Sequence, residues 1–257
     1  MTRASTRTNL HHSRLIRVLT DLAMLGAVEP ATAFAEKLGL WLDLNDAITL
    51  YAVHNASATR PQAANSPAAS GAGTALGSQL VLVRTSLMNS ITKGSSPKDA
   101  KTRVALPSPK LEAPFEAATA FEPYRRYYQA HQRDMDTRIG PLRAQVRDVL
   151  AKASPALRTL AALDSVYDGM LCDRESKLLS RLPGLLEQRF EQMHQTHQPR
   201  LEKAADADNR APLTPPGAWL ARFGHELQTV LLAELDHRLQ PTVGLIEAFN
   251  NETTPHQ

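Results

Sequence analysis

Two Glu-x-x-His pairs come closest to a catalytic pattern in this sequence. Glu191 and His194 form one pair, and Glu234 and His237 form the other. Helical bundles that bind two iron ions use this spacing twice and add a carboxylate from each of two further helices. At 100° per residue, however, Glu191 lies about 140° from Leu186 and far from the apolar stripe of its helix. We therefore interpret Glu191 as a surface residue that happens to match the motif, and we predict no metal site.

A second pattern is a set of arginines on one face of a predicted helix that spans about 115–153. Their side chains fall within about 100° around the axis if the helix continues through Pro141. Such a stripe can bind the phosphates of a nucleic acid, or it can pair with acidic residues of the next helix. We favour the pairing, because runs of charge usually form a solvated face. This arginine stripe consists of Arg125, Arg126, Arg133, Arg143 and Arg147.

Charged residues also fall inside the apolar stripes of two other predicted helices. Glu234 and Arg238 lie within about 20° of Leu227, and Arg174 falls among the apolar residues of its own helix. A charge that is buried without a partner destabilises a fold by several kcal/mol, so two interpretations stand. Either Arg174, Glu234 and Arg238 form a buried network that fixes helix register, or their stripe is an interface for a partner. We favour the network, in which Arg174 pairs with Glu234 or, failing that, with Asp164.

Other catalytic signatures are absent from the sequence. It has no glycine-rich phosphate loop after a strand, no nucleophile elbow and no HExxH motif. Cys172 is the only cysteine, which excludes an intrachain disulfide and a cysteine-based zinc site. The sequence therefore predicts no catalytic residue, no cofactor and no enzyme.

The composition predicts that helices alone position these side chains. Aromatic residues make up 5% of the 257 residues, while alanine and leucine are abundant and no segment alternates as a strand does. We expect an all-α fold with an N-terminal cluster of short helices and a C-terminal antiparallel bundle of long helices, joined by flexible linkers. The predicted segments are an N-terminal helical segment at 1–56, a disordered linker at 57–75, an amphipathic helix at 76–92, a basic linker at 93–114 and the bundle at 115–257.

Individual helices follow from apolar spacing and from capping residues. In the N-terminal segment we expect helices at 10–26, 31–42 and 45–56, with Ile48 and Tyr51 of the third facing the first. In the bundle, Gly140-Pro141 predicts a break or kink, and Ser154 predicts an N-cap before Pro155. The bundle helices are expected at about 115–153, 154–182, 183–204 and 217–249.

The first predicted helix resembles a secretory signal only in part. Basic residues precede an apolar run, but Arg17 and Asp21 interrupt the run where a signal sequence is uncharged. Leu15, Leu19 and Leu22 instead follow helical spacing, which predicts an amphipathic core helix. No segment reaches the roughly 18 apolar residues of a membrane helix. We therefore predict a cytoplasmic protein without membrane insertion.

Four short segments of the sequence are distinctive. They are Phe34-Ala35-Glu36-Lys37-Leu38-Gly39-Leu40-Trp41-Leu42, Asp46-Ala47-Ile48, Pro123-Tyr124-Arg125-Arg126-Tyr127-Tyr128 and Gly140-Pro141-Leu142-Arg143. These segments resemble a proteobacterial domain family of unknown function. The resemblance covers most of the chain apart from the linkers, and it implies no catalytic residues. Genes of that family tend to lie near genes for MotA/TolQ-like and OmpA-like envelope proteins, which implies a cytoplasmic accessory to an envelope assembly.

The sequence thus favours a non-enzymatic helical interaction protein, an adaptor with at least one protein partner. The alternative is a nucleic-acid-associated protein that uses the basic linker and the arginine stripe. A metal-binding helical-bundle enzyme is the least favoured interpretation. The sequence leaves self-association open.

Overall fold

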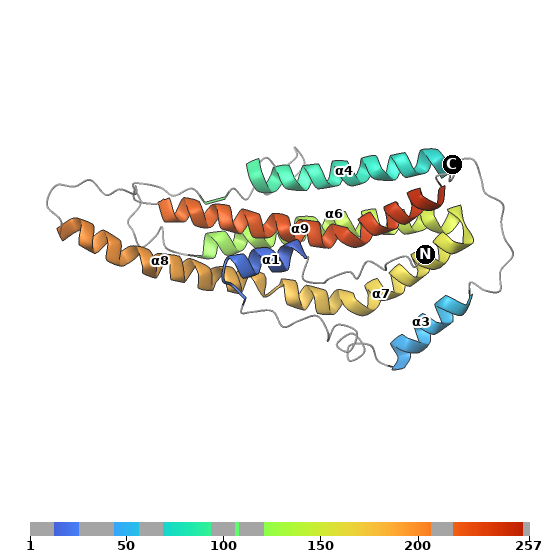
Figure 1. The fold of residues 1–257 in the computed structure, drawn as a ribbon, viewed down its shortest axis with the longest axis horizontal. Helices are drawn as coiled ribbons and strands as arrows, with labels where there is room; N and C mark the ends of the chain where they lie inside the picture. The colour runs from blue at the N-terminus through green and yellow to red at the C-terminus, as the bar shows by residue number, and fades with distance from the viewer. Residues whose placement is uncertain are drawn as a thin grey trace, which may run out of the picture. The chain divides into compact units, whose positions relative to one another are not determined.

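The computed structural model describes residues 13–25, 44–56, 69–93, 106–107, 121–206 and 218–253. Every regular element in these ranges is an α-helix, so the predicted all-α class is confirmed (Figure 1). None of these helices has the length and apolar content that crossing a membrane requires. The helices are α1 (Arg14–Asp21), α3 (Leu44–Ala56), α4 (Ala69–Lys93), α6 (Glu122–Ala153), α7 (Pro155–Leu179), α8 (Leu182–Asp206) and α9 (Ala218–Thr253).

The chain divides into two compact units, and each unit collects segments that are distant in sequence. Unit 1 consists of Met1–Gln79, Leu142–Asp173 and Asp236–Gln257, and unit 2 consists of Leu80–Pro141 and Arg174–Leu235. Four helices are divided between the units, with one part in unit 1 and the other part in unit 2: α4, α6, α7 and α9. This grouping differs from the consecutive segments that the sequence predicted, because apolar stripes pack by their position in space rather than by their order in the chain.

Unit 1 buries apolar residues from five helices. The predicted amphipathic α1 places Leu15 and Leu19 in this core, and its Arg14 donates to the carboxylate of Asp236 on α9. Gly73 of α4 lies so close to the buried Phe249 that an added Cβ would be 3.2 Å from the ring. The other buried apolar residues of this unit are Leu76, Leu142, Val146, Leu150, Leu157, Ala161, Leu239, Leu245 and Ile246.

The end of α1 has the hydrogen bonds of a Schellman motif. The amide of Ala23 donates to the carbonyl of Thr20 (2.9 Å), and the amide of Met24 donates to that of Leu19 (2.9 Å). Ala23 takes the left-handed conformation that this motif requires, with φ of 54°. Glycine is the usual residue at this position, so Ala23 holds a conformation that its Cβ disfavours.

Helices α6 and α7 meet at a single residue, Ser154. Its Oγ accepts a hydrogen bond from the amide of Leu157 (3.1 Å), and Pro155 occupies the first turn, as the sequence predicted. Of the break or kink predicted at Gly140-Pro141, the break is wrong, since one helix spans Glu122–Ala153. Both Gly140 and Pro141 are exposed, so water can solvate the carbonyl that loses its amide donor at the proline.

Unit 2 is built around aromatic side chains from α6, α8 and α9. Phe190 of α8 lies 5.1 Å from Phe223 of α9 and 5.7 Å from Tyr124 of α6, centroid to centroid. Trp219 lies 5.2 Å from Phe190, and Phe121 completes the group. Such tilted and edge-to-face contacts add to the stabilisation that comes from apolar burial.

The structure describes part of each predicted linker. Helix α4 begins at Ala69, so the prediction of disorder is wrong for residues 69–75, where alanine favours helix and Gly73 permits close packing. In the predicted basic linker, Leu106 and Pro107 are half-buried, and the Leu106 side chain lies against Gly224. The rest of both predicted linkers, 57–68 and 94–105 with 108–114, lies outside the described residues.

Helix α3 differs from its prediction in packing rather than in position. Its span of Leu44–Ala56 matches the predicted helix at 45–56. Ile48 is 57% exposed and Tyr51 is 72% exposed, so the prediction that they face the first helix is wrong. The helix predicted at 31–42 lies outside the described residues.

Candidate functional site

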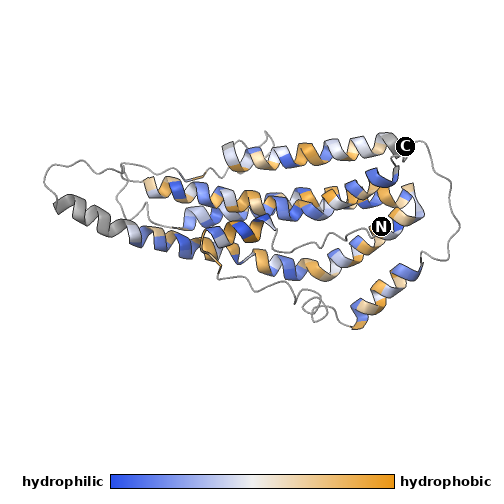
Figure 2. Cartoon of the chain, in the orientation of Figure 1, coloured by the Kyte–Doolittle hydropathy of each residue, from blue (hydrophilic) through white to orange (hydrophobic). Residues whose placement is uncertain are grey.

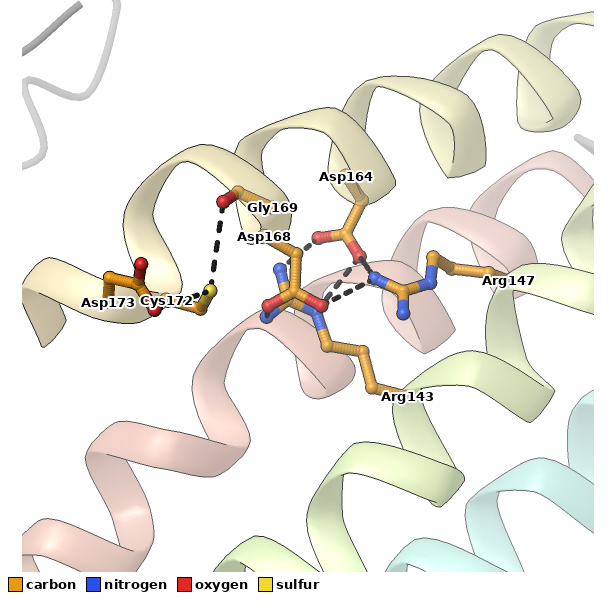
Figure 3. A network of polar contacts seen from close by, with 7 residues as sticks. All are labelled: Arg143, Arg147, Asp164, Asp168, Gly169, Cys172 and Asp173. Atoms are coloured by element: carbon orange, nitrogen blue, oxygen red, sulfur yellow. Dashed lines mark hydrogen bonds and ion pairs between the residues drawn. The ribbon is translucent and has the colours of Figure 1, made fainter. Parts of the chain in front are cut away.

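Two residues of the arginine stripe form an ion-pair cluster with α7 in unit 1. Figure 3 shows Arg143 and Arg147 of α6 pointing toward Asp164 and Asp168 of α7. Arg143 donates through Nη2 to Asp164 Oδ1 (2.6 Å) and through Nε to Oδ2 (2.9 Å), which is a bidentate contact. Its Nη1 donates to Asp168 (2.6 Å), and Arg147 Nη1 donates to both aspartates at 3.2 and 2.9 Å.

The electrostatic balance of this cluster is close to neutral. Two guanidinium groups meet two carboxylates, and three of the four side chains are less than 20% exposed. A phosphate ligand would have to displace these carboxylates. This is the pairing with acids of the next helix that we favoured from sequence. Its effect is to fix α6 and α7 against each other.

We expect Arg143→Met to lower the free energy of unfolding by about 2 kcal/mol, because Asp164 and Asp168 would lose their main counter-charge in a partly dehydrated position. Asp164 is 12% exposed, which keeps this effect above that of a surface pair. Urea denaturation of the purified chain measures the change. Arg133→Met, at an exposed position on the same helix, is the control and should change stability by less than about 0.5 kcal/mol. Equal effects of the two substitutions would contradict the role of the cluster.

Cys172 lies one helical turn beyond this cluster, as Figure 3 shows. Its thiol is exposed, and Sγ lies 3.7 Å from the carbonyl oxygen of Gly169 and 3.8 Å from a carboxylate oxygen of Asp173. Neither of these two contacts is made with a cationic group. The arrangement is that of a surface thiol.

The part of the arginine stripe in unit 2 is only partly engaged with acids. Arg125 Nη2 donates to Glu187 of α8 (2.6 Å), and its guanidinium lies 5.6 Å from the ring centroid of Phe121. Arg126 pairs with Glu122 on its own helix (2.8 Å) and remains 73% exposed. Arg133 is exposed. The exposed arginines of the stripe in this unit are therefore Arg126 and Arg133.

The predicted buried network divides into residues with different surroundings. Glu234 is fully buried, as its spacing indicated, and accepts hydrogen bonds from Tyr128 Oη (2.6 Å) and Gln132 Nε2 (3.0 Å). Arg238 is half-buried and belongs to unit 1. Arg174 is exposed, so the burial predicted for it is wrong.

The reason lies in the face that α7 packs. Leu157, Ala161 and Leu179 are its buried residues, and Asp164 and Asp168 lie on the same side of the helix. Arg174 lies roughly 100° away from that side. The two aspartates face inward because their charges are paired, so apolar spacing alone indicated the wrong face.

Gln132 joins three elements of unit 2 through its amide group. Besides Glu234 of α9, its Nε2 donates to the main-chain carbonyl of Leu179 (3.1 Å), which is the last residue of α7. That carbonyl has no amide donor within its own helix, so the contact caps the helix end. Sequence spacing had selected Glu234 but not Tyr128 or Gln132.

A second buried polar group surrounds the end of α4. The carbonyl of Ile91 accepts hydrogen bonds from Tyr127 Oη (2.8 Å) and from Gln228 Nε2 (2.8 Å). The ring of His131 lies edge-to-face against that of Tyr127, with centroids 4.5 Å apart. Burial lowers the pKa of His131 from 6.5 to about 4, and the charge of Asp134 opposes this shift. The sequence did not predict this buried polar group.

The Glu-x-x-His pairs are not brought together as a metal site. Glu191 is exposed, as its position on the helix predicted, and His194 packs against the ring of Trp219 at 5.6 Å. The buried Glu234 accepts hydrogen bonds from Tyr128 and Gln132. In the part of the chain that the structure describes, no three His, Cys, Asp or Glu side chains are placed to hold a metal ion.

Within each unit, polar side chains link one helix to the next across an apolar core. These features define an all-helical protein in which ion pairs and buried hydrogen bonds connect neighbouring helices. The chain belongs to the DUF3348 family, described as a protein of unknown function, whose family model matches residues 1–251. The resemblance to a family of unknown function is thereby confirmed. No curated protein and no solved structure matched the chain.

Proposed function

We propose that the chain is a non-enzymatic interaction protein that binds a protein partner through α3. The observation that supports this most directly is the exposure of the apolar residues of that helix. Leu44 is 76% exposed, Ile48 is 57% exposed and Tyr51 is 72% exposed. They are spaced by four and three residues, so they lie within about 60° of one another on one side of the helix.

The chemistry of this α3 face fits a helix or groove with apolar side chains. Leu44–Ala56 contains two titratable charged or basic residues, Asp46 and His54. Asp46 lies on the opposite side of the helix from Leu44. A stripe of apolar residues at four-and-three spacing is how an amphipathic helix enters a hydrophobic groove. Tyrosine contributes both apolar area and a hydroxyl, and it is enriched at interfaces.

Helix α7 provides a second observation in the same direction. Leu178 is 54% exposed and Tyr167 is 37% exposed, and both belong to the stripe that contains Arg174. The sequence left open whether that stripe is a buried network or an interface. The exposure of Leu178 and Tyr167 supports the interface.

Paired substitutions on α3 test the proposal. The double variant Ile48→Glu, Tyr51→Glu places two charges on the apolar face, and Asn45→Asp, Thr49→Glu places two charges at exposed positions to one side of it. Each variant is expressed in the native cells, cross-linked and purified, and co-isolated proteins are quantified. We expect a defined protein to accompany the parent chain and the control, and to decrease at least about tenfold with the first variant, because a buried unpaired charge destabilises an interface by several kcal/mol. The same proteins in all three samples, or none in any, would reject the α3 face.

We also propose that this interaction takes place in the cytoplasm, as part of an assembly associated with the cell envelope. The family resemblance supports this part, since it implies genes near those of MotA/TolQ-like and OmpA-like proteins. The partner identified by the cross-linking experiment tests it directly. An envelope protein or its cytoplasmic segment is the expected result.

Nucleic-acid binding is the second candidate, and Arg126 and Arg133 favour it because both are exposed on α6. Arg125, Arg143 and Arg147 support it less, since each donates to a carboxylate of another helix. Binding to a labelled duplex or single strand that weakens steeply with salt and is lost with Arg126→Glu, Arg133→Glu would favour this candidate over the adaptor. Arg143→Glu is unsuitable for this test, since it would place a third carboxylate beside Asp164 and Asp168.

A further inference from the structure

Helix α1 covers part of unit 1 with two leucines and one arginine. Leu15 is 6% exposed and Leu19 is 5% exposed, and they lie about 40° apart on one side of the helix. Arg14, one residue before Leu15, forms an ion pair with Asp236 of α9. Figure 2 shows both apolar and hydrophilic residues along α1. The surface of unit 1 under this helix, the α1 seat, therefore accepts an amphipathic helix with a basic residue beside two leucines.

Helix α1 is a weakly held element of unit 1. It has eight residues, and a helix of that length is not stable in water by itself. Leu15 and Leu19 are its buried residues, and the Arg14 side chain is 51% exposed, where an ion pair contributes little. Within the described chain, the Ser13 side chain makes no capping hydrogen bond, and Ala23 holds the left-handed conformation beyond the other end. These features favour exchange of α1 between a docked and a released state.

Release of α1 exposes a surface with a defined chemistry. Water then contacts the apolar area that Leu15 and Leu19 cover in the docked state, beside the carboxylate of Asp236. A helix with a complementary apolar stripe is stabilised by covering that area again. The carboxylate sets its orientation, because it attracts a basic residue at the start of the incoming helix and repels an acidic one.

We propose that the α1 seat is a docking site for an amphipathic helix of another protein, which displaces α1. The incoming helix carries a basic residue directly before a leucine and a second leucine four residues after the first. Helix α1 identifies this occupant, because it shows which side chains the seat accepts. The site rests on the proposed interaction role and adds a second surface to it. The attached α1 inhibits binding there, since it competes at a high effective concentration.

A fluorescently labelled peptide of residues 13–25 serves as the partner helix, and its binding to the full chain is measured by anisotropy. We expect Leu15→Glu, Leu19→Glu in the chain to release α1 and to increase the affinity for the peptide at least about tenfold, because the attached competitor is gone. Arg17→Glu is the matched control, since Arg17 is exposed about 160° from Leu15. It should leave the affinity near that of the parent chain. Circular dichroism checks that both variants keep their helical content.

The role of the carboxylate is tested by charge reversal. Asp236→Lys, added to the release variant, should weaken peptide binding at least about tenfold, because like charges would meet at the seat. A peptide with Arg14→Glu should bind this lysine variant better than the unchanged peptide does. That rescue separates the loss of a charge pair from damage to the fold. In the parent chain, an excess of the peptide should accelerate hydrogen exchange of the α1 amides.

Equal affinity of the peptide for the parent chain and the release variant would overturn the docking site, and so would binding that Asp236→Lys does not change. Amides of α1 that exchange as slowly as those of α9, even with excess peptide, would show that α1 is not displaced. A parent chain that dimerises in sedimentation velocity, with a release variant that stays monomeric, would assign the seat to α1 of a second copy instead. None of these outcomes affects binding through α3, which the cross-linking experiment measures separately.

Discussion

Lowering the pH from 7 to 5 is expected to decrease the free energy of unfolding by about 2 kcal/mol through His131 alone. Its pKa is about 4 in the folded chain, because the ring is 7% exposed, and 6.5 in the unfolded chain. Below pH 6.5 the unfolded chain therefore binds a proton that the folded chain excludes. Stability is highest above pH 6.5 and is lost as the pH falls toward 4, by about 3 kcal/mol in total.

The substitution His131→Phe isolates this contribution. Phenylalanine keeps a ring against Tyr127 and removes the titration, so the variant should lose less stability between pH 7 and pH 5 than the parent chain. Urea denaturation at several pH values in this range measures both. Carboxylates titrate mainly below it, which keeps their contribution small. Parallel curves for the two proteins would show that His131 does not titrate with a lowered pKa.

The second large effect is expected at the buried carboxylate of Glu234. Tyr128→Phe removes the hydroxyl that donates to it at 2.6 Å and leaves a dehydrated charge with fewer donors. A hydrogen bond to a charged group in such a position stabilises by about 1.5–3 kcal/mol, and we expect a loss near the upper end. Thermal and urea denaturation of the single variant give the value.

A double-mutant cycle tests whether the two residues act together. Glu234→Leu removes the charge, so adding Tyr128→Phe to it should cost much less than Tyr128→Phe in the parent chain, with a coupling of about 1.5–3 kcal/mol. Tyr128→Phe combined with Gln145→Ala, at an exposed position of unit 1, should be additive. Additivity in the first cycle as well would mean that the hydrogen bond contributes nothing measurable.

At these sites the sequence predicted the burial of some charged residues correctly and of others wrongly. Spacing on the helix correctly put Glu234 inside and Glu191 outside, because both follow from the phase of a strong apolar stripe. The same method failed for Arg174. Asp164 and Asp168 lie on the packed face of helix α7. A hydropathy pattern assigns charged residues to the exposed face, so it predicts the wrong face when those charges are paired across the interface between helices.

Local features of the fold could be predicted from the sequence. The N-cap at Ser154, the buried Leu15 and Leu19 of α1, and the helical class itself depend on residues close together in the chain. The start of α4 was missed because residues 69–75 lack large apolar side chains. Their helix is continuous with α4, and Gly73 allows a close approach to Phe249 on α9.

The sequence by itself determined that the chain forms helices, and which side of most of them is apolar, because backbone propensity and apolar spacing act within a few turns. Only the tertiary structure decided which polar groups meet. Tyr128 and Glu234 are 106 residues apart, and Arg143 and Asp164 are 21 apart. Contacts between residues this far apart in the sequence depend on how whole helices pack and rotate against one another. That rotation set the environment of His131 and exposed the apolar face of α3.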